Sequence, residues 1–427
     1  MRKFVRRSMV WGAVSALGLA AVPIAAAAQE STRWRAVDAS TGQIADVDGL
    51  AQLAADFPDS GSVRLRLLNA LLEAGDLEGA WRELTWLLDR GHRFGPGGQA
   101  QLQDLFAGPY AAELIRRFAV PVTPVMASEV VGEVPAEAHL LEGLSVVRAT
   151  GNQYLTSVVS RELWVRHDGG WLNTGLHAGG NPSGIAFDRR HGVWVAVGDL
   201  GMLPAGIPSF GGLVLLGPSQ PDVPSQVSFP APTGVNLSDL ALGTASVVYA
   251  SDPLAGGIYR LPSTASAITP LVAPGTLRSP QGLAESADGH LLYASDYRYG
   301  LAMIDLASGT VSRLPADVPM LLDGIDGLWL HEGELIAIQN GTSPMRIVAL
   351  RLSADGRRIV GRRVLEQDHP DWTEPLGGSI ANGMLYYIAN GQWDRFAPGG
   401  TLVEGALPEP TLIRTVPLDG PPQVESP

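Results

Sequence analysis

The chain has 427 residues and no cysteine, and this absence excludes several kinds of chemistry at once. It can form no disulfide, it offers no thiolate to a metal, and it has no cysteine nucleophile. It also lacks the cysteine that would carry a lipid after export. Any metal site in this protein must therefore use oxygen or nitrogen ligands.

Charged residues are scarce as well, at 17% of the chain, whereas hydrophobic residues make up 45%. This balance is typical of a globular protein and not of a disordered one. Glycine and proline are frequent, with 51 and 32 copies, which favours many short strands joined by turns. The length allows two or three domains and a large core.

Positive charge is the scarcer sign, and the formal net charge is −13. Removal of the basic leader described below would take this charge to about −17. A protein this acidic should repel nucleic acid and anionic lipid, so we expect no nucleic-acid partner.

The first 28 residues have the pattern of a secretory signal peptide. Four basic residues precede an apolar run over residues 9–25, and Ala26 and Ala28 give the small-residue pattern that signal peptidase cuts. A membrane anchor is the alternative, but the run is short and ends in a cleavage site. The pair Arg6-Arg7 suggests a twin-arginine signal, yet its flanking residues match poorly, so we expect Sec-type export. No later stretch could span a bilayer, so the mature chain should be periplasmic or secreted, away from the membrane.

Residues 29–119 should form a small α-helical region. In VRLRLLNALLEAGDLEGAWRELTWLLDRG, leucine and alanine recur every three or four positions, and a shift at Gly75-Asp76 indicates a break between two helices. The recurring positions are Leu65, Leu68, Leu72, Ala80, Leu84 and Leu87. The stretch resembles a single tetratricopeptide hairpin, and one repeat cannot cover its own apolar face. It should therefore pack on neighbouring helices or on the second domain, either as a plain cap or as a module that binds a protein partner.

From residue 120 the hydrophobic period changes, and short strand-like segments separated by Gly, Asp, Asn and Pro recur as far as residue 420. Each unit opens with a polar residue, a turn residue such as glycine, and an aliphatic residue, and a second and often a third strand follow. The openings are Glu142-Gly143-Leu144, Ser183-Gly184-Ile185, Ser238-Asp239-Leu240, Gln281-Gly282-Leu283 and Asp326-Gly327-Leu328, with a weaker sixth unit at EPLGGSIANGMLYYIANG.

Repeats of roughly 40 to 55 residues have the size of propeller blades. Six of them predict a mainly β fold, a six-bladed β-propeller over residues 120–420. A sandwich or a β-helix is the alternative for short, regular strands, but a sandwich would not repeat one unit six times. Segments 125–131 and 411–416 should share one blade and close the ring, and residues 421–427 should form a disordered tail.

The pairs Glu142-Gly143, Gln281-Gly282 and Asp326-Gly327, with YASD before the next turn, resemble the family of senescence marker protein, gluconolactonase and luciferin-regenerating enzyme. The resemblance covers about residues 136–418, and its motifs are short. It implies a six-bladed propeller with one divalent cation, usually calcium, in the central channel, and a hydrolase that opens lactones.

By position, this resemblance makes Glu142, Gln281 and Asp326 metal ligands, and it makes Asp326 the general base as well. The family has asparagine where this chain has Gln281, so a cation there must shift or gain a water. Substrate contact in the family falls near Ser238-Asp239, with Asn236 two residues earlier in this chain.

The residue types themselves also point to a hard cation. Inner strands of a propeller run side by side around one axis, so the polar residues that open the units should converge. Two carboxylates and several neutral oxygens suit Ca²⁺ or another divalent cation of that kind, and histidine, which zinc favours, is missing at these positions. Such an ion could polarise a lactone carbonyl while Asp326 or Asp239 takes a proton from water. No nucleophile elbow, HExxH, P-loop or GxGxxG motif offers another mechanism.

Other polar residues have simpler interpretations. Asp252 and Asp296 end the second strands in YASD and should cap turns, and Asn340 and Asn390 should be turn residues of the same kind. His331 should be solvated in a hairpin turn.

One histidine, one further aspartate and the tryptophans of the propeller have predicted positions as well. His177, in the glycine-rich HAGG segment, could reach the channel mouth and contact substrate. Asp323 should lie in the approach loop. Trp329 and Trp393, like Trp194, should pack within blades.

Two functions from different classes remain open at this point. The first is an exported, calcium-dependent hydrolase of a small lactone or ester, which Glu142 and Asp326 favour. The second is a non-catalytic propeller whose rim and helical region bind a protein or carbohydrate, which the helical hairpin and Gln281 favour. In the second case the polar ring would only hydrate the channel.

Overall fold

The computed structural model describes residues 32–217 and 226–420. The predicted signal peptide and the predicted C-terminal tail lie outside the described residues. Within the described part, no helix has both the length and the apolar composition that a membrane crossing needs.

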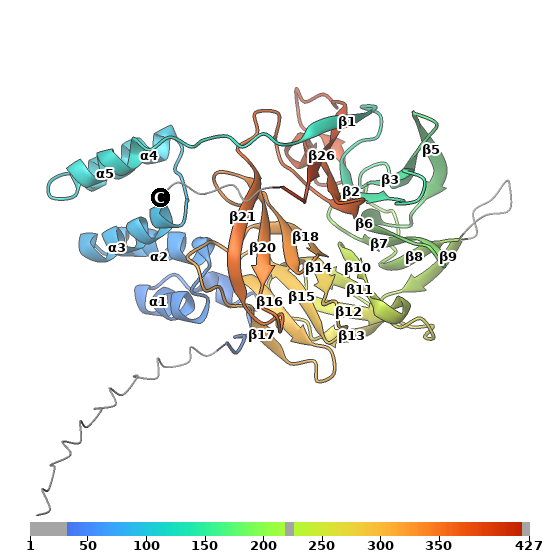
Figure 1. Ribbon diagram of the computed structural model, residues 1–427, viewed down its shortest axis with the longest axis horizontal. Coiled ribbons are helices and arrows are strands. Elements are labelled where there is room, and N and C mark those ends of the chain that lie inside the picture. The colour runs from blue at the N-terminus through green and yellow to red at the C-terminus, as the bar shows by residue number, and fades with distance from the viewer. Residues whose placement is uncertain (1–31, 218–225, 421–427) are drawn as a thin grey trace, which may run out of the picture. The chain divides into compact units, whose positions relative to one another are not determined.

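Six four-stranded antiparallel sheets follow one another along the chain (Figure 1). The first three sheets are β2 (Leu141–Val146), β3 (Gln153–Ser157), β4 (Glu162–His167) and β5 (Gly170–His177); β6 (Asn181–Asp188), β7 (Gly192–Gly198), β8 (Gly212–Leu216) and β9 (Gln226–Pro230); and β10 (Leu240–Leu242), β11 (Val248–Asp252), β12 (Gly257–Leu261) and β13 (Thr269–Val272).

The last three sheets complete the set, and a short hairpin, β24 (Phe396–Ala397) and β25 (Thr401–Leu402), is inserted in the sixth. They are β14 (Pro280–Glu285), β15 (Leu291–Asp296), β16 (Gly300–Asp305) and β17 (Val311–Arg313); β18 (Ile325–His331), β19 (Glu334–Gln339), β20 (Arg346–Leu352) and β21 (Ile359–Gln367); and β22 (Gly378–Ala381), β23 (Met384–Ile388), β26 (Thr411–Pro417) and β1 (Glu129–Val134).

The innermost strands of the six sheets form a closed ring. β2 contacts β6, β6 contacts β10, β10 contacts β14, β14 contacts β18, β18 contacts β22, and β22 contacts β2. This closed order is that of a six-bladed β-propeller, and it confirms the fold predicted from the repeats.

The ring is closed by strands from the two ends of the propeller sequence. β1 pairs with β26 in the sixth blade, with Glu129 opposite Thr415 and Val134 opposite Thr411. The prediction that an early and a late strand share one blade is therefore confirmed, although β1 begins four residues later than expected. Sharing a blade leaves the ring without a gap whose unpaired strand edges could bind another chain.

The polar residue and glycine that open each repeat form a local irregularity in the inner strand. Strand pairing shifts between Leu141 and Leu144 in β2, and similar shifts occur in β6, β14 and β18. Glycine is needed here because the neighbouring blade is so near: a β-carbon on Gly143 would lie 2.0 Å from the carbonyl oxygen of Ser183. The repeated motif thus marks the point where adjacent inner strands approach most closely.

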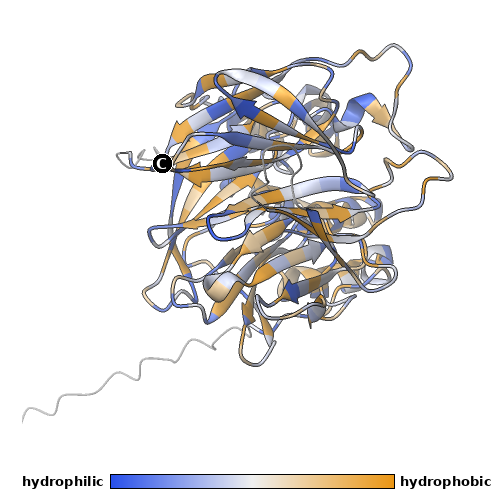
Figure 2. Ribbon diagram, turned by 90° about the vertical axis from the view of Figure 1, so that its right-hand side faces the viewer, coloured by the Kyte–Doolittle hydropathy of each residue, from blue (hydrophilic) through white to orange (hydrophobic). Residues whose placement is uncertain are grey.

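The core lies between neighbouring sheets, where alternate strand residues interdigitate. Buried aliphatic residues such as Leu328, Leu335 and Val348 of the fifth blade pack against Leu291 and Leu301 of the fourth. Figure 2 shows hydrophobic residues recurring along the strands. Burial of apolar area on this scale is the main favourable contribution to folding.

Five helices precede the propeller, namely α1 (Val47–Asp56), α2 (Gly61–Glu73), α3 (Leu77–Asp89), α4 (Pro96–Leu105) and α5 (Ala111–Phe118). The Asp46, Ser60 and Asp76 side chains accept backbone N–H bonds at the starts of the first three. The helix break lies at Gly75-Asp76 as predicted, with Gly75 in the left-handed region at φ 76°. The tetratricopeptide likeness of this hairpin stays a prediction.

The helices share one core with the third and fourth blades. Leu53 and Phe57 of the helical region belong to the same buried cluster as Ile258 and Leu292 of the propeller. The rings of Phe57 and Tyr299 lie 4.7 Å apart. The helical region therefore covers its apolar face against the second domain, which was one of the two packing arrangements expected.

Candidate metal centre at one end of the channel

The starts of the inner strands bring the predicted polar residues to one place. Glu142 in β2, Gln281 in β14, Asp326 in β18 and Ser238 before β10 line a cavity of about 370 Å³. We call this the acidic cavity. A narrower space of about 40 Å³ continues from it and also touches Asp239. Positions up to 184 residues apart in the chain thus meet because the ring is closed.

Glu374 joins the acidic cavity from the loop before β22, so four carboxyl groups gather there. Among the described residues, none of the four has an ion-pair partner. Each has some surface on the cavity, yet protein surrounds each one, so water screens their charges poorly.

Burial raises the pKa of every member of this group, and the charges of other members add to this shift for Glu142 and Asp326. Burial, followed by the charge of Asp326, raises the pKa of Glu142 well above its usual value. Burial, followed by the charges of Asp239 and Glu374, raises the pKa of Asp326 to about 7. Burial raises the pKa of Asp239 to about 6, against a hydrogen bond from the Leu240 N–H. Burial also raises the pKa of Glu374. Without a cation, the group therefore retains protons near neutral pH.

Two hydrogen bonds orient the carboxylates of the acidic cavity. The indole Nε1 of Trp393 donates to Glu142 Oε2 at 2.7 Å. The Asn340 amide donates to Asp326 Oδ2 at 3.3 Å and to the Pro375 carbonyl oxygen at 3.1 Å. Tyr297 fixes this amide by donating its hydroxyl to Asn340 Oδ1 at 2.9 Å.

These contacts add to one prediction and correct another. Trp393 packs against blade cores as predicted, and it also donates a hydrogen bond to Glu142. Asn340 was expected to be a simple turn residue, but it holds Asp326. Sequence reasoning also missed Tyr297 and Glu374, because all four residues lie in connecting segments outside the repeated motif and no local pattern marks them.

The remaining predicted site residues fall into two groups. Ser238 lines the acidic cavity, and its carbonyl oxygen accepts the Gly184 N–H at 2.6 Å. Asn236 is engaged elsewhere: its side-chain oxygen accepts the Asp199 N–H at 2.8 Å, and its own N–H donates to Asp252. The backbone of His177 ends β5, the outermost strand of its blade, opposite Glu162. The bonds of Asn236 give no support to its predicted substrate contact, and the predicted contact of His177 stays a prediction.

Asp252 and Asp296 cap turns, as predicted. Asp252 Oδ1 accepts the Leu254 and Ala255 N–H groups, both at 3.0 Å. Asp296 makes the corresponding bonds after β15. Asn390 likewise bonds backbone groups of the loop before β26.

Asp323 has a role that the sequence did not reveal. It is buried, and its carboxylate accepts the Gly61 N–H at 2.8 Å, the Ser62 N–H at 2.7 Å and the Ser62 hydroxyl at 2.6 Å. Burial raises the pKa of Asp323, and the bonds from Ser62 and Gly61 oppose this shift. The start of α2 is thereby attached to the loop that leads into β18 and Asp326.

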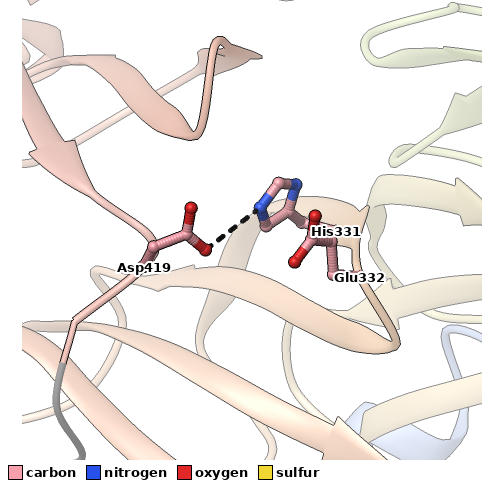
Figure 3. Close-up of side chains that lie close together, drawn as sticks. All are labelled: His331, Glu332 and Asp419. Carbon is pink, nitrogen blue, oxygen red and sulfur yellow. Dashed lines mark ion pairs between the residues drawn. The ribbon is translucent and has the colours of Figure 1, made fainter.

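His331 is less exposed than predicted, and two carboxylates lie near it. Its side chain is 19% exposed, and its Nε2 lies 3.9 Å from Asp419 Oδ1. Figure 3 shows these two side chains with Glu332, whose ligand atoms lie within 4.8 Å of theirs. Because exposed acidic groups gather without an ion on many surfaces, this arrangement alone defines no site.

The donor set of the acidic cavity is that of a hard-cation site. Glu142, Asp239, Asp326 and Gln281 offer carboxylate and amide oxygens, which Ca²⁺ prefers, and among the side chains that the structure describes no histidine lines either part of the cavity. In the described part of the chain, no cationic side chain forms an ion pair with these carboxylates, and their pKa values are raised. The residues present therefore fit a divalent cation and do not fit zinc.

No protein-family model and no curated protein sequence matches the chain. Solved structures similar to it include a gluconolactonase from Xanthomonas campestris, at 17% identity over 70% of this chain and 99% of that one, with a TM-score of 0.44. The calcium-binding protein regucalcin from Agrobacterium tumefaciens gives 17% identity, 67% and 93% coverage and a TM-score of 0.46. The PQQ-bound aldose sugar dehydrogenase from Streptomyces coelicolor is 16% identical over 70% of this chain and 100% of that one, with a TM-score of 0.45. The neighbours thus include gluconolactonase-like propellers together with an oxidoreductase, and at this level no activity is transferred from them.

Proposed function

We propose that this protein is an exported hydrolase that opens lactones or related esters with a divalent cation, Ca²⁺ by preference, in the acidic cavity. The observation that carries the proposal is the gathering of Glu142, Asp239, Asp326 and Glu374 without a cationic partner among the described residues. Such a group is unfavourable by itself, because burial raises the pKa of all four carboxyl groups and the charges of Asp239 and Glu374 raise those of Glu142 and Asp326 further. A cation coordinated by their oxygens would remove that cost.

Glu142, Asp326 and Gln281 would hold the cation, with Asp239 close by. Bound there, the cation would polarise the substrate carbonyl and ease the deprotonation of water. Trp393 and Asn340 support this role because each fixes one carboxylate oxygen and leaves the second oxygen of the same carboxylate for another ligand.

Asp239 would accept the proton of the attacking water, since its pKa of about 6 leaves it ionised and basic near neutral pH. The water oxygen then forms a bond with the carbonyl carbon, and the ring C–O bond breaks. The proton passes from Asp239 to the leaving oxygen, and the product is a hydroxy acid. Asp326 is the alternative base if the cation leaves one of its oxygens unbound.

The test is hydrolysis of a panel of five- and six-membered lactones and aryl esters by the mature protein, followed as acid release with Ca²⁺ and with EDTA. We expect calcium-dependent hydrolysis of at least one lactone, and a loss of roughly 100-fold or more in Asp239→Asn. The control is Asp355→Asn, an exposed turn residue of the fifth blade. Equal rates in Ca²⁺ and EDTA would contradict the proposal.

A second candidate function is the binding of a protein partner through the helical region. Large hydrophobic side chains are exposed there, including Leu77 and Leu105, each 41% exposed, and Ile115, 57% exposed. This would be the main function if the metal-loaded protein hydrolyses nothing in the panel.

A further inference from the structure

The channel has a second cavity at the other ends of the same inner strands. Its volume is about 940 Å³, which is larger than the acidic cavity and within the usual size of small-molecule sites. We call it the arginine cavity, after Arg148 and Arg189 in its lining. It is formed by residues that follow Gly143, Gly184, Gln281 and Gly327 along their strands. Neither the proposed hydrolysis nor the metal site uses it.

The walls of the arginine cavity are mainly apolar. All six inner strands contribute, and the apolar residues include Val146, Ile185, Phe187, Leu242, Leu283 and Ile380. Trp329 lines the arginine cavity and also the narrow space that continues from the acidic cavity. Its ring lies against Gly327: a β-carbon on that glycine would lie 2.2 Å from Cη2 of the indole. The indole therefore lies between the carboxylates and the arginine cavity, in addition to the blade packing that was predicted for it.

Two exposed guanidinium groups lie at this cavity, and neither is neutralised. Arg148 Nε donates to the neutral Asn382 Oδ1 at 3.1 Å. Among the described residues, Arg189 has no ion pair. One carboxylate, Glu285, also lines the cavity, but it accepts the Thr244 N–H at 2.9 Å and the Thr244 hydroxyl at 2.6 Å, and it bonds Tyr249. In a chain with a net charge of −13, uncompensated positive charge at an apolar cavity is a local exception.

We infer that the arginine cavity is a second binding site, for a small organic anion with an apolar body, such as an aromatic carboxylate. The anionic group would lie between the guanidinium groups of Arg148 and Arg189, which donate paired N–H bonds to carboxylates. The body would lie against Phe187 and Trp329, where burial of apolar surface is favourable. A neutral molecule of the same shape would form no ion pair with either arginine.

The test compares 2-naphthoate with 2-naphthol by isothermal titration calorimetry on the mature protein at pH 7 and low salt. EDTA is present throughout, so that no cation in the acidic cavity can take the carboxylate. We expect one naphthoate per chain, with binding at least 10-fold tighter than that of naphthol, because the two differ mainly in charge. Quenching of tryptophan fluorescence should accompany binding, and Trp329→Phe should reduce it.

The variants assign the binding to this cavity. Arg148→Gln with Arg189→Gln should weaken naphthoate binding roughly 10-fold or more and leave naphthol binding unchanged. Arg190→Gln is the matched control, because Arg190 is the exposed neighbour of Arg189 and does not line the cavity. Equal binding of the two probes, no binding of naphthoate, or an equal loss in Arg190→Gln would overturn the inference. None of these outcomes bears on the metal site.

Discussion

The two ends of the propeller channel are built from the same six strands but have opposite chemistry. At the starts of the strands, Glu142 and Asp326 stand beside glycines and form the acidic cavity. At the ends, the same strands present apolar residues, with Arg148 and Arg189 nearby. Only a few residues separate the two cavities along each inner strand. The position of a residue along its strand therefore decides which cavity its side chain lines.

The comparison shows that the unfavourable electrostatic energy of like charges is concentrated at one end of the channel. Four carboxylates with raised pKa values lie at one end, although the protein has enough arginines to neutralise them. The helical region is bonded to loops at this end: Asp323 accepts backbone N–H groups at the start of α2, and the Ser60 hydroxyl donates to the Arg298 carbonyl oxygen at 2.7 Å. Both contacts lie on loops that carry Tyr297 or lead to Asp326.

The largest expected effect is at Asp326. Saturating Ca²⁺ should raise the melting temperature of the wild-type protein by several degrees, because ligand binding to the folded state adds about 2.7 kcal/mol at 100 times Kd. Asp326→Ala should abolish this rise. In EDTA the same variant should melt no lower than wild type, because it removes a repelled charge. Arg148→Gln, at the other end of the channel, should respond to Ca²⁺ as wild type does.

The next effect is at Asp323, which joins the helices to the acidic end. Asp323→Ala should lower the free energy of unfolding by about 3 kcal/mol, because the buried Gly61 N–H and the Ser62 groups lose their acceptor. It should also weaken Ca²⁺ binding, whereas Asp355→Ala on an exposed turn should change neither quantity. Unchanged Ca²⁺ affinity in Asp323→Ala would show that the helices stabilise the fold without positioning the site.

The pH dependence of stability should distinguish the acidic end from an ordinary surface. The folded-state pKa values of Asp326 and Asp239 lie above the unfolded value, so the folded protein binds more protons and stability falls as pH rises from about 4 to 7. In EDTA, thermal melts should therefore show a lower melting temperature at pH 8 than at pH 5. Asp326→Asn should reduce this slope, and saturating Ca²⁺ should cancel it. A melting temperature in EDTA that rises over the same range would count against the raised pKa values.

The smallest effect is expected at Trp393. Trp393→Phe removes the N–H bond to Glu142 and should weaken Ca²⁺ binding roughly 10-fold. Trp194→Phe is the matched control, since the Trp194 Nε1 is buried without a hydrogen bond among the described residues. An equal change in both variants would mean that Trp393 acts through packing.

The sequence predicted the parts of this structure that repeat. Glu142, Gln281 and Asp326 could be placed together because each precedes a glycine in a recurring unit, and a closed ring makes equivalent positions meet. The repeat marked Asn340 only as a turn residue, and Trp393 lies in a connecting segment, so the sequence did not reveal the bonds of these two residues to Asp326 and Glu142. The bond between Asp323 and Gly61 joins residues 262 positions apart in two different regions, and no local pattern marks it.

The sequence predicted the polar residues at one end of the channel but not the arginines at the other, because only residues within the repeated motif can be placed from the sequence. The polar openings of the repeats indicated an acidic end. The arginine cavity depends on Arg148 and Arg189, which lie beyond the strands in turns where arginine is ordinary. Their place in the lining of one cavity follows only from the assembly of the blades.

The most direct measurement is calorimetric titration of the metal-free mature protein with Ca²⁺ at pH 7, repeated in buffers of different ionisation enthalpy. We expect one ion per chain and the release of about one to two protons, because Glu142 and Asp326 retain protons near neutrality until a cation replaces them. Absence of binding, or binding with no proton release, would contradict a buried carboxylate centre at this end of the channel.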